Sequence, residues 1–271
     1  MSAVNPTGNP ADQFPARRVI LLGASNLTRG ISTVVDACHR LWGGPLDLMG
    51  ALGHGRSYGA DSRVMGRGLP GILQCGLWSA ARSRPPAPTA ALVTDIGNDL
   101  LYETPVDIIA RWVTQNLDAL LDLNARVVMT RLPVGNIDGL AEWKFKALRR
   151  VMFPKGRLPL SAIAERAHEL DARLVEAATA RQIKMVQLPP AWYGFDPIHM
   201  KRSAWPLAWH EILRGWSDLD DAPTPERPST KPGRWLYLVS RAPERRSFFG
   251  MDRQCPQPCG KLSEGTVVSF F

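Results

Sequence analysis

Residues 17–30 read RRVILLGASNLTRG, and this stretch decides how the rest of the chain is interpreted. Residues 19–22 form an unbroken apolar run, which is typical of a strand buried on both faces of a sheet. Because Gly23-Ala24 allows a sharp turn, we expect Ser25 at the carboxyl end of this strand and at the start of a helix. Ligands bind outside the carboxyl ends of strands in open parallel sheets, so Ser25 is a candidate for chemistry; the alternative is that it only caps the helix.

The composition is that of a globular protein. The chain has 271 residues, of which 45% are hydrophobic and 21% charged, enough for one large domain and an appendage. Residues 1–16 are polar and proline-rich, lack the apolar core of a signal peptide and are expected to be flexible. No apolar run reaches the roughly 18 residues that a membrane span needs. We therefore expect a cytoplasmic protein without a membrane span.

The chain is basic, with a formal net charge of +8 and a pI near 9.7. Its arginines are scattered along the sequence, apart from pairs such as Arg149-Arg150 and Arg245-Arg246. Nucleic-acid binding usually needs a concentrated basic face with stacking aromatic side chains. We therefore expect no nucleic-acid partner, and we interpret the charge as favouring solubility and the attraction of anionic substrates.

Four cysteines fall into two pairs of different character. Cys38 and Cys75 stand alone in the main body, where a buried, reduced thiol is expected. Cys255 and Cys259 form a CPQPC motif with no histidine or further cysteine nearby. An isolated CxxxC spacing is weak evidence for zinc, so we expect no metal site there.

Apolar runs that read as strands alternate with patterns that read as helices. The strands are expected at 19–22, 46–52, 90–96, 125–132 and 183–188, and the helices at 29–42, 105–124, 141–153, 160–180 and 203–216. Residues 63–80 are predicted to be one further helix, interrupted at 69–71. This alternation predicts an α/β fold in which a doubly wound, mostly parallel, five-stranded sheet lies between two layers of helices.

The last part of the chain differs in composition from the rest. From residue 217 it is rich in proline and charge, so we expect residues 217–271 to be an irregular tail attached to a domain at 17–216. Two short β-prone runs, 234–240 and 266–271, are expected to pair with each other or with a sheet edge.

The carboxyl ends of four predicted strands carry the residue types that acyl transfer uses. They are Ser25 after the first strand, Gly53 and Gly55 after the second, Asn98 after the third, and Asp196 and His199 after the fifth. In a parallel sheet these ends meet at one rim. His199 can take the proton of Ser25, and Asp196 can hold the imidazole in the useful tautomer. A glycine N–H, the Asn98 amide and the Ser25 N–H can together stabilise an oxyanion.

Each of these residues also has a purely structural interpretation. His199 is then an ordinary loop histidine, Asn98-Asp99 a helix cap or turn, and Asp196 a turn residue before Pro197. The glycine-rich loop at 53–62 (GHGRSYGADS), called the glycine loop below, is then a surface loop. The occurrence of all four features at separate strand ends favours a site over four unrelated turns.

Four short segments give the sequence a resemblance to a known family. With GAS at 23–25, glycine at 53–55, GND at 97–99 and DPIH at 196–199, residues 17–216 resemble the SGNH (GDSL-type) hydrolases. The resemblance implies a flavodoxin-like three-layer fold and ester hydrolysis without a metal or other cofactor. It also implies that Ser25 is nucleophile and oxyanion donor, Asn98 an oxyanion donor, His199 the base and Asp196 its orienting partner.

The sequence departs from the family pattern at three points. Ala24 stands where the family has aspartate, Ile96 where a glycine or threonine is usual, and the second segment lacks an asparagine two residues before its glycine. Aligning GHGRS with the family pattern selects Gly55 as the oxyanion glycine, with Gly53 as the alternative.

The leading functional hypothesis is a serine esterase acting on a small-molecule ester through an acyl-enzyme. The alternatives are an acyltransferase that uses the same groups and an inactive small-ligand-binding protein on the same fold. Asp95 is interpreted as a structural residue at a strand end or as a further acid near the rim. Residues 192, 193 and 195, which are aromatic, either line the substrate pocket or pack their own loop.

Overall fold

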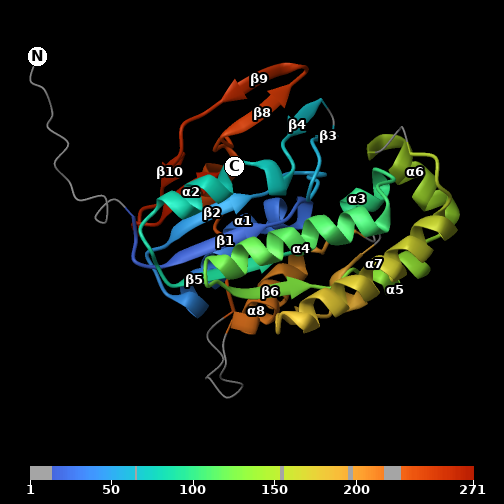
Figure 1. Ribbon diagram of the computed structural model, residues 1–271, viewed down its shortest axis with the longest axis horizontal. Helices are drawn as coiled ribbons and strands as arrows, with labels where there is room; N and C mark the ends of the chain where they lie inside the picture. Colours follow the sequence, from blue (N-terminus) through green and yellow to red (C-terminus); the bar gives the residue numbers. More distant parts are fainter. Residues whose placement is uncertain (1–13, 65, 153–155, 195–197, 217–226) are drawn as a thin grey trace, which may run out of the picture.

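A seven-stranded sheet forms the central layer of the molecule (Figure 1). The computed structural model describes residues 14–64, 66–152, 156–194, 198–216 and 227–271. The strand order is β10-β11-β2-β1-β5-β6-β7, and every pairing is parallel except β10 with β11. The bounds are β1 (Arg18–Leu22), β2 (Asp47–Ala51), β5 (Thr89–Val93), β6 (Arg126–Thr130), β7 (Lys184–Val186), β10 (Gly260–Lys261) and β11 (Val267–Phe270).

The five predicted strands are all present, as β1, β2, β5, β6 and β7. Their order in space places the second strand first, followed by the first, third, fourth and fifth, which is the flavodoxin-like order. Every residue of β1, β2 and β5 is buried, as expected for strands covered on both faces. The predicted fold class is confirmed, but the sheet has seven strands, because β10 and β11 extend it beyond β2.

Helices cover both faces of the sheet. On one face lie α1 (Ser25–Trp42), α8 (Trp205–Leu213) and α9 (Pro232–Val239), and on the other α2 (Leu77–Ser83), α4 (Val106–Asp122) and α7 (Leu160–Ala180). Side chains of β1 alternate between the two apolar layers: Val19 and Leu21 pack toward α1, whereas Ile20 and Leu22 pack toward α4. The three-layer arrangement follows from this alternation. Shorter helices α3 (Asn98–Leu101), α5 (Val134–Asp138) and α6 (Glu142–Met152) lie near the carboxyl ends of β5 and β6.

Residues 63–80 do not form the interrupted helix predicted from the sequence. They contain a hairpin of β3 (Ser62–Val64) and β4 (Arg67–Leu69), a 3-10 turn at Ile72–Gln74 and the start of α2. Gly66 adopts a φ of +77° in the hairpin turn, a conformation that side chains disfavour. This glycine, together with the Pro70-Gly71 pair, breaks a helix but suits a turn and the end of a strand.

The prediction of an irregular tail is wrong for the described residues 227–271. They form α9, β8 (Arg245–Phe248), β9 (Met251–Gln254), β10 and β11. The run 234–240 is helical rather than extended because Pro232 occupies the first turn and Leu238 turns toward the core. The run 266–271 does pair with the edge of the predicted sheet, because β11 lies in parallel beside β2, and β10 then forms the outermost strand. Strand β8 pairs with β4, so β3-β4-β8-β9 forms a second sheet (Figure 1).

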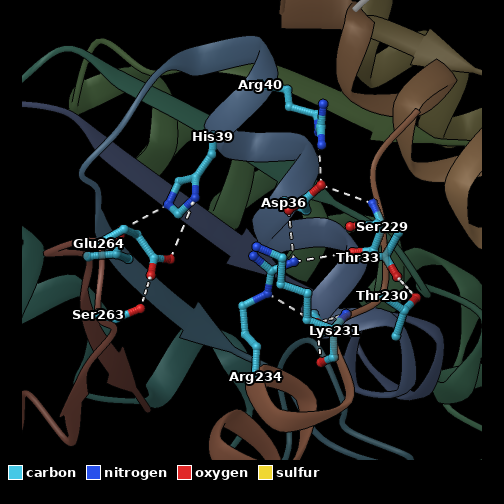
Figure 2. Close-up of polar contacts among 12 residues, drawn as sticks. Thr33, Asp36, His39, Arg40, Ser229, Thr230, Lys231, Arg234, Ser263 and Glu264 are labelled. Atoms are coloured by element: carbon cyan, nitrogen blue, oxygen red, sulfur yellow. Dashed lines mark hydrogen bonds and ion pairs between the residues drawn. The ribbon is translucent and has the colours of Figure 1, made fainter. Parts of the chain in front are cut away.

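Polar contacts from Asp36 attach the C-terminal segment to α1. The Asp36 carboxylate accepts hydrogen bonds from the Ser229 N–H at 2.9 Å, Arg234 Nη2 at 3.0 Å and Arg40 Nε at 2.8 Å (Figure 2). Burial by itself would raise the pKa of Asp36, but these hydrogen bonds outweigh burial and lower the pKa to about 2. The carboxylate therefore stabilises the docking of α9 mainly in its ionised form.

The cysteines, the membrane span and the N-terminal segment were each the subject of an expectation made from the sequence. Cys38 and Cys75 are free and buried, as predicted, whereas Cys255 and Cys259 are free and partly exposed. Among the helices that the structure describes, none is both long and apolar enough to cross a membrane. Residues 1–13, which include most of the segment expected to be flexible, lie outside the described residues.

Replacing Asp36 tests the docking of the C-terminal segment. Because the folded-state pKa is lowered from 3.8 to about 2, the stabilisation is present above about pH 4 and is lost as the pH falls toward 2. Asp36→Asn should lower the free energy of unfolding at pH 7 by about 1–2 kcal/mol. Urea unfolding should show this deficit shrinking between pH 4 and pH 3. Asp107→Asn, at an exposed carboxylate on α4, is the control with little effect at either pH; an Asp36→Asn deficit independent of pH contradicts the role.

Candidate active site

Ser25 stands where β1 passes into α1. It is the first residue of the helix, follows the N-cap residue Ala24 and is largely buried. The structure does not support the alternative that Ser25 caps the helix, because no side chain of the N-cap position bonds the first turn and Ser25 Oγ faces His199 instead.

Asp95, in the segment that follows β5, accepts hydrogen bonds from the backbone N–H groups at the start of α1. Its Oδ2 accepts hydrogen bonds from the N–H groups of Ala24 at 3.0 Å, Asn26 at 2.9 Å and Leu27 at 3.2 Å. Asp95 thus has the structural role anticipated as one of its two interpretations, and its φ of 60° is one that aspartate tolerates better than most residues. Within the described part of the chain, the Ser25 N–H has no hydrogen-bond acceptor, so this donor remains available.

His199 reaches Ser25 from the other end of the predicted domain. Its Nε2 lies 2.9 Å from Ser25 Oγ, across 174 residues of sequence. Hydrogen-bond contact between a serine hydroxyl and an imidazole is the geometry that lets the imidazole remove the hydroxyl proton. The structure therefore brings together the two residues that the sequence analysis paired.

Asn26 fixes the backbone on both sides of His199, a role that the sequence analysis missed. Its Nδ2 donates to Asp95 Oδ1 at 2.8 Å and to the Ile198 carbonyl at 2.9 Å, and its Oδ1 accepts the Met200 N–H at 2.8 Å. One buried amide thus holds the 198–200 segment against the first turn of α1. The only sequence signal was its position next to Ser25.

Asp196 was predicted to orient His199. It falls within 195–197, outside the described residues. Its relation to the imidazole therefore stays a prediction.

The predicted oxyanion groups lie on two adjoining segments. Asn98 begins α3, and its Nδ2 donates to the Arg56 carbonyl at 3.4 Å, so the amide contacts the backbone of the residue that follows Gly55. Gly55 has a φ of +66°, and its carbonyl accepts the Tyr102 hydroxyl at 2.7 Å. Ser25 and Asn98 line the same small cavity. The structure therefore places the amide of Asn98 beside both the cavity at Ser25 and the glycine loop.

A buried arginine anchors this glycine loop. The Arg56 guanidinium is fully buried and donates to the carbonyls of Pro70 at 3.1 Å, Leu52 at 3.4 Å and Phe271. It therefore connects the loop to the β3–β4 region and to the C-terminal strand. Arg56 was not singled out from the sequence, because its partners are carbonyls of distant segments.

Asp99 stabilises the glycine loop from the interior of the protein. Its carboxylate accepts the Tyr58 N–H at 2.9 Å. Burial raises the pKa of Asp99 to about 6, although hydrogen bonds from Ser57 and Tyr58 work in the opposite direction. The Asn98-Asp99 pair therefore has divided roles, with Asn98 at the cavity and Asp99 in the interior.

The cavity beside Ser25 is small and mostly apolar. Its volume is about 100 Å³, and its apolar lining includes Leu100, Leu132, Phe145, Leu160, Ile163 and Leu188. Of the aromatic residues expected either to line the pocket or to pack the loop, Tyr193 lines this cavity, whereas Trp192 is buried in the layer against α1. Phe195 lies outside the described residues. A cavity of this kind suits a short apolar group next to Ser25.

His54 is a second histidine near the rim that the sequence analysis did not select. Although its side chain reaches solvent, partial burial lowers its pKa, and the charges of His199, Arg29 and Arg67 lower it further. Burial and the neighbouring cationic groups therefore disfavour the protonated form of the His54 imidazole. In the described residues, no group of three or more His, Cys, Asp or Glu side chains is arranged to bind a metal ion.

Comparisons with known proteins return solved structures only. No protein-family model and no curated protein matches the sequence. A psychrotrophic esterase from Pseudoalteromonas sp., inhibited by monoethylphosphonate, is 12% identical and aligns over 72% of this chain and 93% of its own, with a TM-score of 0.46. A carbohydrate acetylesterase from Sinorhizobium meliloti is 18% identical over 72% of this chain and 96% of its own, with a TM-score of 0.49. The inhibitor-bound aryl esterase of M. smegmatis is 15% identical over 74% of this chain and 100% of its own, with a TM-score of 0.49.

Removal of the Asn26 amide should loosen the segment that carries His199. In Asn26→Ala the buried Met200 N–H loses its acceptor, so its amide hydrogen should exchange with solvent at least about tenfold faster. NMR-detected exchange measures this at single residues. The Lys201 N–H, which bonds to the Trp192 carbonyl at 2.8 Å, is the internal reference and should change little. Equal exchange of Met200 in both proteins would show that Asn26 does not hold this segment.

Proposed function

We propose that this protein is a serine esterase of the SGNH (GDSL) type that hydrolyses a carboxylic ester through an acyl-enzyme. The observation that carries the proposal is the 2.9 Å contact between Ser25 Oγ and His199 Nε2 at the carboxyl edge of a parallel sheet. The Ser25 N–H, which has no acceptor in the described part of the chain, and the Asn98 amide beside the same cavity support it, because an ester carbonyl needs donors at the oxygen that becomes charged.

The first half of the proposed reaction forms the acyl-enzyme. Ser25 Oγ attacks the ester carbonyl carbon while His199 Nε2 takes the hydroxyl proton. The N–H groups of Ser25 and Gly55 and the Asn98 amide donate to the resulting oxyanion. When the carbonyl re-forms, the bond to the alcohol oxygen breaks, and His199 returns the proton to the departing alcohol.

The second half of the proposed reaction hydrolyses the acyl-enzyme by the same steps, with water as the attacking group. His199 takes a proton from water as the water oxygen attacks the acyl carbon. When the tetrahedral intermediate collapses, the bond between the acyl carbon and Ser25 Oγ breaks, the acid leaves, and His199 returns the proton to Ser25 Oγ. His199 can accept at Nε2 only when its proton is on Nδ1. We assign Asp196 to hold that proton, as the resemblance to the SGNH hydrolases implies.

The test uses single substitutions and short-chain aryl esters. Ser25→Ala and His199→Gln should each lower kcat by at least about 10³-fold, because nucleophile and base act as one unit. Asp196→Asn should lower kcat by at least about tenfold, because the imidazole loses the partner that fixes its tautomer. Initial rates of ester hydrolysis measure all three.

Matched controls replace the same residue types away from the site. Ser161→Ala changes an exposed serine of α7, and His168→Gln changes an exposed histidine that bonds to Asp138. Both should keep the parent rate. Wild-type activity in folded Ser25→Ala would remove Ser25 from the mechanism. Complete inactivity of the parent protein toward esters would instead favour a ligand-binding protein.

A further inference from the structure

A second, larger cavity adjoins the proposed active site. Its volume is about 590 Å³, and it lies where α1 and the glycine loop meet α9 and the β3-β4-β8-β9 sheet. Thr28, one turn after Ser25 on α1, and His54, between Gly53 and Gly55, line the side nearest Ser25. The C-terminal segment supplies much of the opposite wall, including Leu238, Arg241, Arg246 and Arg253.

The cavity is strongly basic. Four arginines line it, namely Arg67, Arg241, Arg246 and Arg253. No aspartate or glutamate occurs among the described residues of its lining, and none of the four arginines forms a salt bridge in the part of the chain that the structure describes. The cavity is therefore positively charged, and the described residues supply no acidic side chain that balances this charge.

Strand register concentrates this charge on one face of the small sheet. Arg246 of β8 lies directly opposite Arg253 of β9, and Arg67 of β4 lies opposite Phe248, two residues further along β8. Because side chains alternate along a strand, these arginines share the face that lines the cavity. Like charges directly opposite one another destabilise a strand pair. An arginine pair placed this way is stabilised when an anion lies between the guanidinium groups.

The opposite face of the same strands has mixed charge. It carries Arg245 opposite Gln254 and Ser247 opposite Asp252. Arg246 and Arg253 also border a hollow on that side, where Asp61 and Asp252 offset part of the charge, so the excess of positive charge is larger on the cavity side. Arg241 also lines the cavity; its guanidinium stacks on the Tyr237 ring at 4.4 Å, and its buried Nε has no hydrogen-bond partner among the described residues.

We propose that this cavity binds an anionic group, of the phosphate or sulfate type, on the alcohol portion of the ester substrate. The inference rests on the proposed esterase function. The acyl group would occupy the 100 Å³ apolar cavity next to Ser25, and the anionic group would meet Arg246 and Arg253 in the 590 Å³ cavity. Arginine suits this task because its planar guanidinium donates two parallel hydrogen bonds to such oxyanions.

The experiment compares two acetate esters that differ in charge. They are 2-acetoxyethyl phosphate and the neutral 2-methoxyethyl acetate, with 2-acetoxyethyl sulfate as the arm that separates phosphate from sulfate. The wild type should hydrolyse at least one anionic ester with a kcat/KM at least about tenfold above that of the neutral ester. The double variant Arg246→Gln/Arg253→Gln should lose this preference through a higher KM and keep its rate on the neutral ester.

Arg245→Gln is the matched control, because this arginine lies on the same strand but on the other face. It should keep the preference for the anionic ester. Equal kcat/KM for charged and neutral esters in the wild type overturns the proposal, and so does equal loss of preference in Arg245→Gln and the double variant.

The experiment also distinguishes failure of the proposed esterase function from failure of the proposed anion site. If none of the three esters is hydrolysed, the proposed function fails, and calorimetric titration with 2-hydroxyethyl phosphate and 2-hydroxyethyl sulfate then decides on the cavity. Binding of either that is weakened at least about tenfold in the double variant and retained in Arg245→Gln supports an anion site. No binding of either compound to the wild type overturns it.

Discussion

The site depends on one hydrogen-bonded junction, in which Asp95 and Asn26 join three distant segments. The Asp95 carboxylate holds the first turn of α1, and the Asn26 amide ties that turn to the 198–200 segment. Because Ser25 lies in the first segment and His199 in the third, their 2.9 Å contact is a consequence of this junction. Asp95 also accepts the backbone N–H groups on either side of Ser25, whereas the Ser25 N–H has no acceptor among the described residues and is available to a ligand.

The C-terminal segment completes the structure around this junction. Strand β11 extends the main sheet beside β2, and its neighbour Phe271 accepts a hydrogen bond from Arg56 of the glycine loop. Strand β8 pairs with β4, so the same segment builds the wall of the larger cavity. A region that is rich in proline and charge thus positions the loop of Gly55 and adds basic side chains close to it.

Local patterns in the sequence were sufficient for the central sheet and for the pairing of Ser25 with His199. Buried parallel strands read as apolar runs, and their carboxyl ends meet at one rim whatever the details of the helices. The β3–β4 hairpin and strands β8 and β9 could not be predicted, because they are stabilised by pairings such as Gly68 with Ser247 across most of the chain. The role of Asn26 escaped for the same reason, since its partners are fixed only by the fold.

The most direct test of the central claim is covalent labelling of the wild-type protein with an aryl phosphonate ester, followed by peptide mass spectrometry. A serine activated by His199 attacks phosphorus and releases the aryl alcohol, so we expect a single adduct, located on Ser25. In His199→Gln the same adduct should form at least about a hundredfold more slowly. An unlabelled Ser25, or labelling that is equally fast without the imidazole, would contradict the account.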